Sequence, residues 1–135
     1  MQFADTNVLL YSISTDSAEE TKAERARQIL RDRDLRLSVQ VLQEFYVQAT
    51  RPTRRDALPH DIAVGLIRTW LRFRVQETSV SIMTSALEIK AEHGLSYWDA
   101  AIVAAARALG CGELYSEDMT HGRVIERVAT INPFR

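Results

Sequence analysis

Cysteine is almost absent from this chain of 135 residues, which contains only Cys111. A single cysteine cannot form an internal disulfide, and Cys111 has no Cys or His neighbour at the spacing of a zinc site. The sequence therefore argues against zinc and redox chemistry. It is typical of a protein from a reducing compartment, and we expect it to be cytoplasmic.

Long apolar segments and glycine-rich loops are also missing. The first residues, MQFADTN, include an acidic residue and no basic leader, so we expect neither a signal peptide nor a membrane anchor. The five glycines form no phosphate-binding loop. No repeat or low-complexity segment interrupts the chain. Its 46% hydrophobic and 26% charged residues predict a single domain over residues 1–135.

A strong excess of either charge is missing as well, because 17 Lys and Arg nearly balance 18 Asp and Glu. This total gives no general electrostatic reason to expect nucleic acid as a partner. Residues 51–74, however, contain six arginines and two aspartates. Such a stretch is consistent with contact to a phosphate backbone, and equally with a helix whose arginines face water.

Helical periodicity and short β-like segments alternate along the chain. Strands are predicted near residues 2–4, 35–37, 75–77, 113–116 and 129–131. Helices are predicted near residues 8–13, 18–33 and 38–50. Three more follow: one that begins at Pro59 and contains Trp70, one that ends at His93, and one from Ser96 to Gly110. In the helix that begins at Pro59, apolar residues at helical spacing predict one packed face, formed by Ile62, Leu66, Ile67 and Trp70.

Several residues are suited to the ends of these helices. Ser38 and Ser96 are good N-caps, and Gly94 is a good C-cap. Short strands separated by helices predict an α/β sandwich, with helices on both faces of a short-stranded, mostly parallel central sheet. Ligands of such sheets bind beyond the carboxyl ends of the strands.

Two acidic residues follow predicted strands, where a site of this architecture would form. Asp5 follows a short apolar strand and precedes a helix, so it also suits an N-cap role, which is compatible with a functional one. Asp118 follows the strand that ends near Ser116, where a turn aspartate is the ordinary alternative. We choose Asp118 over Glu117 because strand alternation places it on the side of Ser116.

Two further acidic residues lie on apolar helical segments. Glu44 lies in the segment VQVLQEFYVQA with Val41 and Val47 on its side, although a solvent-facing glutamate is the common alternative. Asp99 shares a helix face with apolar residues, although its position after Ser96 also suits a capping box. A carboxylate on a buried face is costly unless it is paired or protonated, so both residues are candidates for a site.

These four carboxylates would repel one another at one edge of a sheet unless a cation lay between them. Oxygen ligands favour a hard cation, so we expect Mg²⁺, with Mn²⁺ able to replace it. Such an ion activates a water molecule for in-line attack on a phosphodiester and neutralises the departing oxygen. The four acids therefore predict metal-dependent hydrolysis without a side-chain nucleophile.

Other catalytic schemes fit less well. A Ser/His/Asp site would have to use His60, His93 or His121, and none of them accompanies a nucleophile-elbow sequence. We predict that these histidines are surface or packing residues. A phosphotransfer enzyme of the haloacid-dehalogenase type needs a second aspartate where this chain has Asn7.

Four segments carry the likeness to a known family: ADTNVLLY at 4–11, SVQVLQEF at 38–45, YWDAAIV at 97–103 and SEDM at 116–119. Together they resemble the PIN-domain ribonucleases, in particular the VapC-type toxins of bacterial toxin–antitoxin pairs. The resemblance covers essentially the whole chain in the family's order and spacing, and each segment contains the acid that the family has there.

The resemblance implies a Mg²⁺- or Mn²⁺-dependent endoribonuclease with a PIN-like α/β/α sandwich. It also implies an RNA substrate, a homodimer, and a small DNA-binding antitoxin whose tail enters the active-site groove. The family's acidic quartet corresponds to Asp5, Glu44, Asp99 and Asp118, and the residues that orient it correspond to Thr6, Asn7 and Ser116.

Two alternatives stay open. A non-catalytic RNA-binding scaffold with the same fold would have no need of the four acids. A nuclease that cuts DNA could use the same metal site, because the sequence contains no module that reads the 2′-hydroxyl of RNA. The RNA target is equally open.

Overall fold

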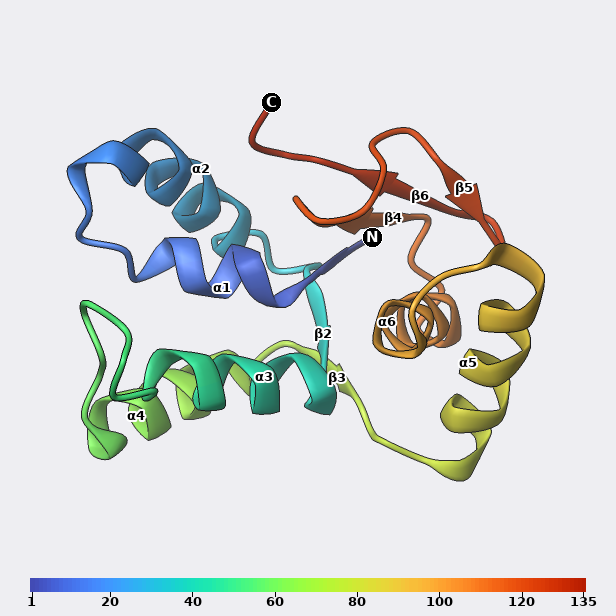
Figure 1. Cartoon of the computed structure of the whole chain (residues 1–135), viewed down its shortest axis with the longest axis horizontal. Coiled ribbons are helices and arrows are strands. Elements are labelled where there is room, and N and C mark those ends of the chain that lie inside the picture. The colour runs from blue at the N-terminus through green and yellow to red at the C-terminus, as the bar shows by residue number, and fades with distance from the viewer.

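A computed structural model describes all residues from 1 to 135 (Figure 1). The strands are β1 (Gln2–Ala4), β2 (Arg36–Ser38), β3 (Arg74–Gln76), β4 (Glu113–Tyr115), β5 (Val124–Ile125) and β6 (Val128–Ile131). The helices are α1 (Thr6–Ser12), α2 (Glu20–Leu30), α3 (Val39–Ala49), α4 (His60–Trp70), α5 (Val80–His93) and α6 (Tyr97–Ala108), with a 3-10 turn, η1 (Ser17–Glu19). No helix is both long and apolar enough to cross a membrane.

The strands form one sheet in the order β3-β2-β1-β4-β6-β5, and only the β5–β6 pair is antiparallel. Helices α1 to α4 lie on one face of the sheet, and α5 and α6 lie on the other (Figure 1). Right-handed connections explain this division. The chain moves across the sheet in one direction from β1 through β2 to β3, and then in the opposite direction from β3 to β4, so the helices of the last connection lie on the other face. The predicted α/β sandwich with a short-stranded, mostly parallel sheet is confirmed.

Short polar motifs begin and end the helices at the expected residues. Ser38, Ser79 and Ser96 cap α3, α5 and α6, and each side chain accepts a hydrogen bond from a backbone N–H in the first turn. Gly94 ends α5 with φ of 67°, a left-handed conformation that glycine adopts without the strain of a β-carbon. The predicted caps Ser38, Ser96 and Gly94 are therefore confirmed.

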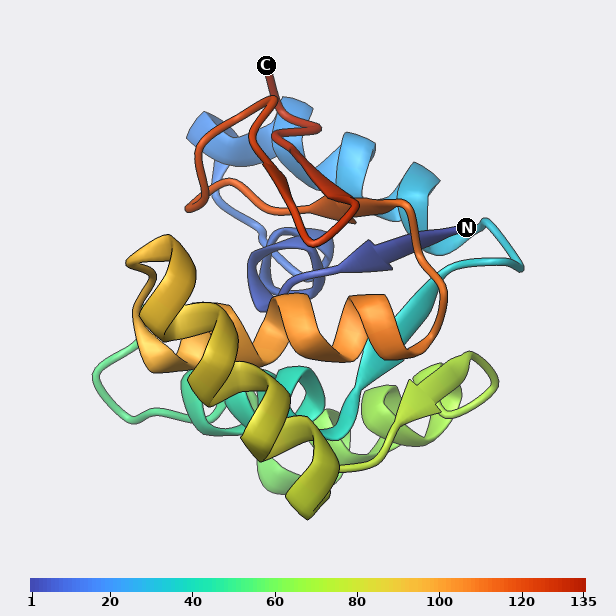
Figure 2. The same cartoon turned by 90° about the vertical axis from the view of Figure 1, so that its right-hand side faces the viewer.

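Helix α6 is the centre of the hydrophobic core. Every residue from Ala100 to Ala106 is buried, because α6 packs between the sheet and α5. Figure 2 shows α5 crossing over α6, with the sheet behind. On the sheet, Phe3, Leu37 and Leu114 are fully buried. In the same view the carboxyl end of β1, the first turn of α6 and the loop after α3 all lie on the left, so this packing fixes one end of the sheet as the place for a site.

Three details differ from the predictions. Ile62 was expected on the packed face of α4 but is 54% exposed, because α4 packs mainly against α3 and only part of that face is covered. The helix expected over 18–33 is a 3-10 turn followed by α2, which ends at Leu30. The hairpin of β5 and β6 was not predicted, because its turn residues Glu126 and Arg127 lack the usual Asn-Gly signal.

Candidate metal centre

Four acidic side chains from four parts of the chain line one small cavity, which we call the acidic cavity. Asp5 follows β1, Glu44 lies in α3, Asp99 lies in the first turn of α6, and Asp118 lies in the loop after β4. The cavity has a volume of about 110 Å³, and its other lining residues are Thr6, Asn7, Leu10, Gln48, Trp98 and Ile102.

The sheet topology explains why residues so distant in sequence meet here. Strands β1 and β4 are parallel neighbours, with Ala4 opposite Tyr115. The backbone N–H of Asp5 extends this pairing by donating to the carbonyl of Tyr115 at 2.9 Å. The segments after both strands therefore leave the sheet at the same edge, which brings Asp5 and Asp118 to one site.

Asp5 is the most buried of the four acids, with 6% of its surface exposed. One carboxylate oxygen accepts the backbone N–H of Thr6 at 2.7 Å, and the other accepts the hydroxyl of Ser116 at 2.8 Å. Burial raises the pKa of Asp5 to about 6, and the nearby charges of Glu44 and Asp118 add to this rise. Asp5 is also the N-cap of α1, so the capping role considered from the sequence is present beside its place in the cavity.

Glu44 is joined to Asp5 through Thr6. The Thr6 hydroxyl donates to one oxygen of Glu44 at 2.7 Å, and the side-chain amide of Gln40 donates to the other at 3.0 Å. The sequence placed Glu44 on an apolar face beside Val47, but Glu44 is only half-buried and Val47 is 55% exposed. Its side of α3 faces the acidic cavity rather than the core.

Asp99 directly precedes the buried part of α6, which begins at Ala100. Its backbone N–H donates to the hydroxyl of Ser96 at 3.2 Å, which is one of the two hydrogen bonds of the capping box considered from the sequence. Burial raises the pKa of the Asp99 carboxyl, and the charges of Asp118 and Glu44 raise it further. Asp99 therefore shares the electrostatic environment of the other three acids.

Asp118 and Glu117 point to different partners. The carboxylate of Glu117 accepts hydrogen bonds from Lys22 at 2.7 Å and from the hydroxyl of Tyr11 at 2.5 Å, which engages it outside the acidic cavity. Asp118 is exposed at the mouth of the cavity and accepts the side-chain amide of Asn7 at 3.2 Å. The structure thus brings Asp118, and not Glu117, to the other three acids.

The four acids of the cavity have no positively charged partner. The ion pairs of the chain are Lys22–Glu117, Arg107–Glu126, and His93 with Glu92 and Glu126. Clustered carboxylates without a cation repel one another, so this part of the chain is electrostatically strained unless a cation or a proton is bound.

Ser116 connects Asp5 and Asp118 through hydrogen bonds. Its buried hydroxyl donates to Asp5 and accepts the backbone N–H of Asp118 at 3.2 Å. We predict that Ser116→Ala lowers the free energy of unfolding by about 1–3 kcal/mol, because both groups lose a buried partner. Urea unfolding measures this, with Ser81→Ala at an exposed position as the control. Equal stability of Ser116→Ala and the parent would contradict the prediction.

The arginines of residues 51–74 do not form a single stripe. Arg51 and Glu44 both line a shallow cavity. Arg72 instead donates to the carbonyl of Leu30 at 3.0 Å, and Arg74 opens β3 at the amino edge of the sheet. The local excess of positive charge is therefore divided between opposite ends of the sheet.

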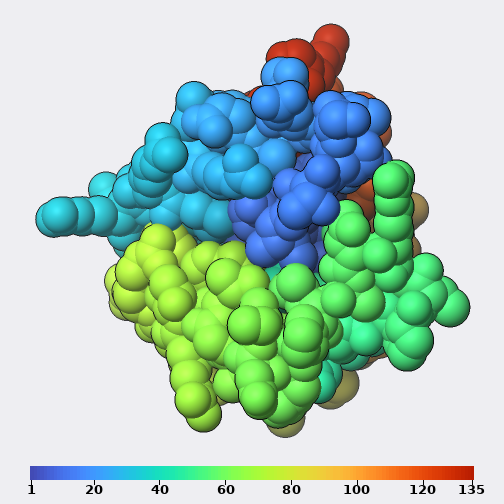
Figure 3. Space-filling model, turned by 90° about the vertical axis from the view of Figure 1, so that its left-hand side faces the viewer, coloured from blue at the N-terminus to red at the C-terminus, as the bar shows by residue number.

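The loop between α3 and α4, residues 50–59, folds back beside the N-terminal helices. Figure 3 shows this green segment next to the blue surface of α1 and η1. The hydroxyl of Thr15 donates to Asp56 at 2.8 Å and ties the loop in this position. Arg51 is the second residue of this loop and lines the same shallow cavity as Glu44.

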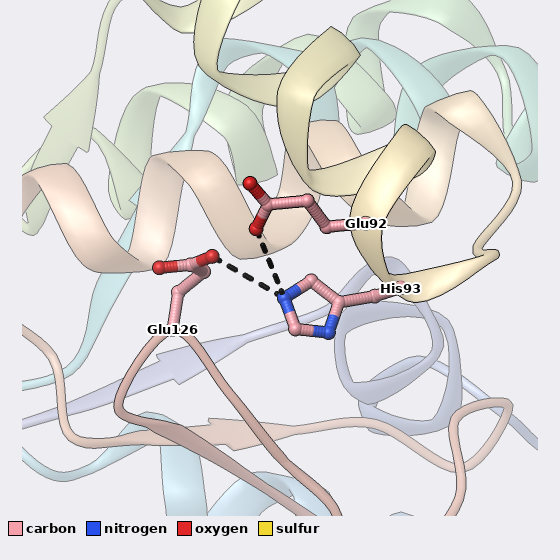
Figure 4. A group of neighbouring side chains, drawn as sticks. All are labelled: Glu92, His93 and Glu126. Atoms are coloured by element: carbon pink, nitrogen blue, oxygen red, sulfur yellow. Dashed lines mark hydrogen bonds and ion pairs between the residues drawn. The ribbon is translucent and has the colours of Figure 1, made fainter.

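Away from the acidic cavity, at the end of α5, the potential ligand atoms of Glu92, His93 and Glu126 all lie within 4.8 Å of one another (Figure 4). His93 Nε2 lies 3.2 Å from Glu126 and 3.8 Å from Glu92. Arg107 lies 3.4 Å from the other oxygen of Glu126 and already supplies positive charge there. Glu126 and Arg127 form the β5–β6 turn with φ of 51° and 69°, so these contacts hold a strained turn against α5 and α6.

The three histidines lie outside the acidic cavity. His60 bonds to the hydroxyl of Tyr46 at 2.8 Å, and His121 accepts the backbone N–H of Asn132 at 3.0 Å. With His93 at the end of α5, all three contact groups on the surface or between elements. They supply no nucleophilic site of the Ser/His/Asp kind.

Comparison with known families agrees with the fold and the cavity. The sequence matches the PIN domain family over residues 3–126, a span that contains all four acids. The chain belongs to the PIN domain family. No curated protein sequence matches it significantly.

Solved structures with a similar fold cover nearly the whole PIN domain. The VapC20 toxin of Mycobacterium tuberculosis, described as cleaving the sarcin–ricin loop, has a TM-score of 0.69 at 22% identity, covering 87% of this chain and 90% of its own. A toxin–antitoxin complex from Klebsiella pneumoniae has a TM-score of 0.73 at 20% identity, covering 98% of both chains. VapBC2 of Rickettsia felis, bound to promoter DNA, has a TM-score of 0.65 at 14% identity, covering 96% of both.

Proposed function

We propose that this PIN domain is a metal-dependent endoribonuclease that acts as the toxin of a type II toxin–antitoxin pair. The observation that carries the proposal is the acidic cavity, in which four carboxylates lie together without a positively charged partner. A scaffold domain would have no reason to keep this unfavourable arrangement. The family match supports the nuclease part of the proposal.

The residues of the acidic cavity fit a divalent cation. All four acids offer carboxylate oxygens, the ligands that Mg²⁺ prefers, and Mn²⁺ accepts the same set. Burial raises the pKa of Asp5 to about 6, so a bound cation would relieve the unfavourable charge of this carboxylate. The ion would be held by Asp5, Asp99, Asp118 and Glu44.

The neighbouring side chains hold the four acids in place. Thr6 donates one hydrogen bond to Asp5 and another to Glu44, so it fixes the distance between them. Asp118 is held by two residues: its backbone N–H donates to the Ser116 hydroxyl, and its carboxylate accepts the side-chain amide of Asn7. When bound, the cation supplies Lewis-acid stabilisation of the phosphate and a water of lowered pKa. The chain itself would contribute the negative ligands and the hydrogen bonds that orient them.

Similar proteins support the substrate and the partners that we propose. The VapC20 toxin of Mycobacterium tuberculosis is described as cleaving the sarcin–ricin loop, and the similar structure from Klebsiella pneumoniae is a toxin–antitoxin complex. We therefore propose an RNA substrate and a small DNA-binding antitoxin as partner. The antitoxin would silence the toxin by placing its tail in the groove of the acidic cavity.

Apolar surfaces on the PIN domain support the binding of partners. A groove of about 600 Å³ between α3 and α4 is lined by Val39, Leu42, Gln43, Tyr46, Val47, Ile67 and Leu71. On α5, three further apolar residues are exposed, namely Val80, Met83 and Leu87. Exposed apolar surface of this kind marks protein contacts. We propose that a second copy of the chain, in a homodimer, and the antitoxin cover these two surfaces.

We also propose that the chain forms a single domain and that the protein is cytoplasmic. One six-stranded sheet and one core cluster support a single PIN-like nuclease domain over residues 1–135. The only cysteine, Cys111, is buried and free, which fits the reducing conditions of the cytoplasm.

Cleavage of nucleic acid by antitoxin-free protein tests the function. We expect the protein to cut a mixed pool of structured RNA with Mg²⁺ or Mn²⁺ and to be inactive in EDTA. Single-stranded and duplex DNA of matched sequence are the controls. Cutting of DNA alone would favour the DNA nuclease. Failure of the folded protein to bind metal would favour the non-catalytic scaffold, whereas metal binding without cutting of either polymer would indicate very narrow RNA specificity.

Metal binding has a readout that does not depend on activity. We predict that Mn²⁺ at about 100 times its Kd raises the free energy of unfolding by about 3 kcal/mol, because the ion binds only the folded site. Asp99→Asn should lose most of this gain, whereas Glu88→Gln, at an exposed position on α5, should keep it. Thermal unfolding with and without Mn²⁺ gives the comparison, and an equal gain in both variants would exclude Asp99 as a ligand.

A further inference from the structure

Trp98 is 64% exposed, although the residue that follows it is Asp99 of the acidic cavity. The other tryptophan, Trp70, is 4% exposed and packs edge-to-face on Phe45 with ring centroids 4.7 Å apart. Single exposed apolar residues are ordinary on protein surfaces. The position of Trp98 at the acidic cavity, rather than its exposure alone, distinguishes it from an ordinary surface residue.

Trp98 lies where three cavities meet. It lines the acidic cavity, a cavity of about 200 Å³ between α6 and the start of α5, and a shallow cavity of about 460 Å³, which we call the amide cavity. The other residues of the amide cavity are Gln40, Gln43, Glu44, Val47, Gln48 and Arg51. A flat aromatic ring thus stands beside the proposed metal ligands, with side-chain amides and one guanidinium around it.

The backbone of Trp98 is fixed while much of its surface remains exposed. The side-chain amide of Gln40 donates to the Trp98 carbonyl at 3.2 Å and to Glu44 at 3.0 Å, so it ties the first turn of α6 to the acidic cavity. The ring of Tyr97 packs edge-to-face on the Trp98 ring, with centroids 5.0 Å apart and an interplanar angle of 79°. One neighbouring ring thus contacts the indole, while 64% of Trp98 stays exposed.

We infer that Trp98 is a stacking platform for an unpaired nucleobase next to the phosphate that is cut. This inference rests on the proposed nuclease function and adds a substrate-binding residue to it. Unpaired bases of single-stranded RNA stack on exposed aromatic rings. Side-chain amides such as those of Gln43 and Gln48 offer both donors and acceptors to a base edge, and Arg51 offers a partner for a neighbouring phosphate.

The composition of the amide cavity favours RNA over a protein as the occupant. Only two of its seven lining residues, Val47 and Trp98, are hydrophobic. In the groove between α3 and α4, by contrast, six of the seven lining residues are hydrophobic. An aromatic ring among amides and an arginine matches the mixed polar and π surface of a nucleotide, whereas the apolar groove matches a protein helix.

Fluorescence and binding measurements on the full chain test the platform. The probe is a mixed-sequence single-stranded RNA of ten nucleotides, added with Mg²⁺ to protein that carries Asp5→Asn to prevent cutting. We expect RNA to quench the emission of exposed Trp98, while buried Trp70 is unaffected. In the same background, Trp98→Ala should weaken RNA binding by about ten-fold or more, and Trp98→Phe should restore most of the affinity.

Two controls separate stacking from other roles. Trp98→Phe should bind fluorescein-labelled RNA with nearly parental affinity but show no quenching, because only Trp70 then emits. In protein with Asp5 intact, Trp98→Ala should keep the parental stabilisation by Mn²⁺, because the carboxylates are unchanged. A merely structural role for Trp98 would not produce this combination of results.

The inference would be overturned by unchanged RNA affinity in Trp98→Ala, or by binding without quenching of Trp98. A changed oligomeric state of Trp98→Ala in sedimentation, with unchanged RNA affinity, would assign the ring to a protein contact instead. The proposed function fails in a different way, through absence of metal-dependent cutting by the parent protein. Cutting by the parent with an unchanged KM in Trp98→Ala would reject the platform alone.

Discussion

Asp5→Asn should reduce metal-dependent RNA cleavage on the order of 1,000-fold, measured as kcat/KM. The asparagine keeps the size of the side chain and an oxygen that accepts the Thr6 N–H. It removes the negative charge from the most buried of the four acids, which is the centre of the network through Thr6 and Ser116. The expected loss is therefore one of ligand charge and not of fold.

The matched control is Asp34→Asn, which removes the same charge at an exposed position in the α2–β2 connection. This variant should cut RNA at the parental rate, and both variants should give parental circular dichroism. Parental activity of Asp5→Asn with full metal dependence would contradict the assignment of Asp5 as a ligand. The proposed metal centre would then have to be built on the other three acids.

The same substitution should have the opposite effect on stability in metal-free buffer. The rise of the Asp5 pKa from 3.8 to about 6 corresponds to about 3 kcal/mol against the folded state once the carboxyl is ionised. A carboxyl whose pKa is higher in the folded state binds protons more tightly there, so its contribution to stability falls as pH rises. Above about pH 6 the full penalty is present, and below about pH 4 it is absent.

Asp5→Asn cannot ionise at this position, so it should be more stable than the parent near pH 7 by up to about 3 kcal/mol. The difference should shrink towards zero near pH 4, where the parent is protonated. Urea unfolding of both proteins in EDTA, repeated across this pH range, measures it. A difference that is constant with pH would show that burial of the Asp5 charge is not its source.

Together these two results would identify a residue that opposes folding and is needed for function. Stability lost at a functional site is recovered when the ligand binds only the folded state. The parent protein should therefore overtake Asp5→Asn in stability when Mn²⁺ is added, which links the two predictions through a single carboxylate.

Much of the fold was predictable because its signals are local. Ser38 and Ser96 cap helices through contacts within one turn, and Gly94 ends α5 in a left-handed conformation that its sequence position alone suggests. Alternation of strands and helices was enough to predict the parallel sheet. The β5–β6 hairpin was missed because Glu126 and Arg127 adopt positive φ without glycine, stabilised by contacts with His93 and Arg107 from distant elements.

The sequence by itself determined which acids could form a site, because Asp5, Asp99 and Asp118 stand where strands end or a helix begins. Only the tertiary structure decided that these acids meet. Glu117 and Asp118 are adjacent, and their different directions depend on Lys22 and Tyr11, which hold one of them away from the cavity.

The environment of each side chain was likewise decided by tertiary contacts. Glu44 belongs to the acidic cavity because Thr6 lies against it, and Trp98 is exposed because no other element covers it. The physical reason is the same in each case. Helix caps and strand patterns act between near neighbours in sequence, whereas burial, pairing of charges and the shape of a cavity depend on residues about 40 to 110 positions apart.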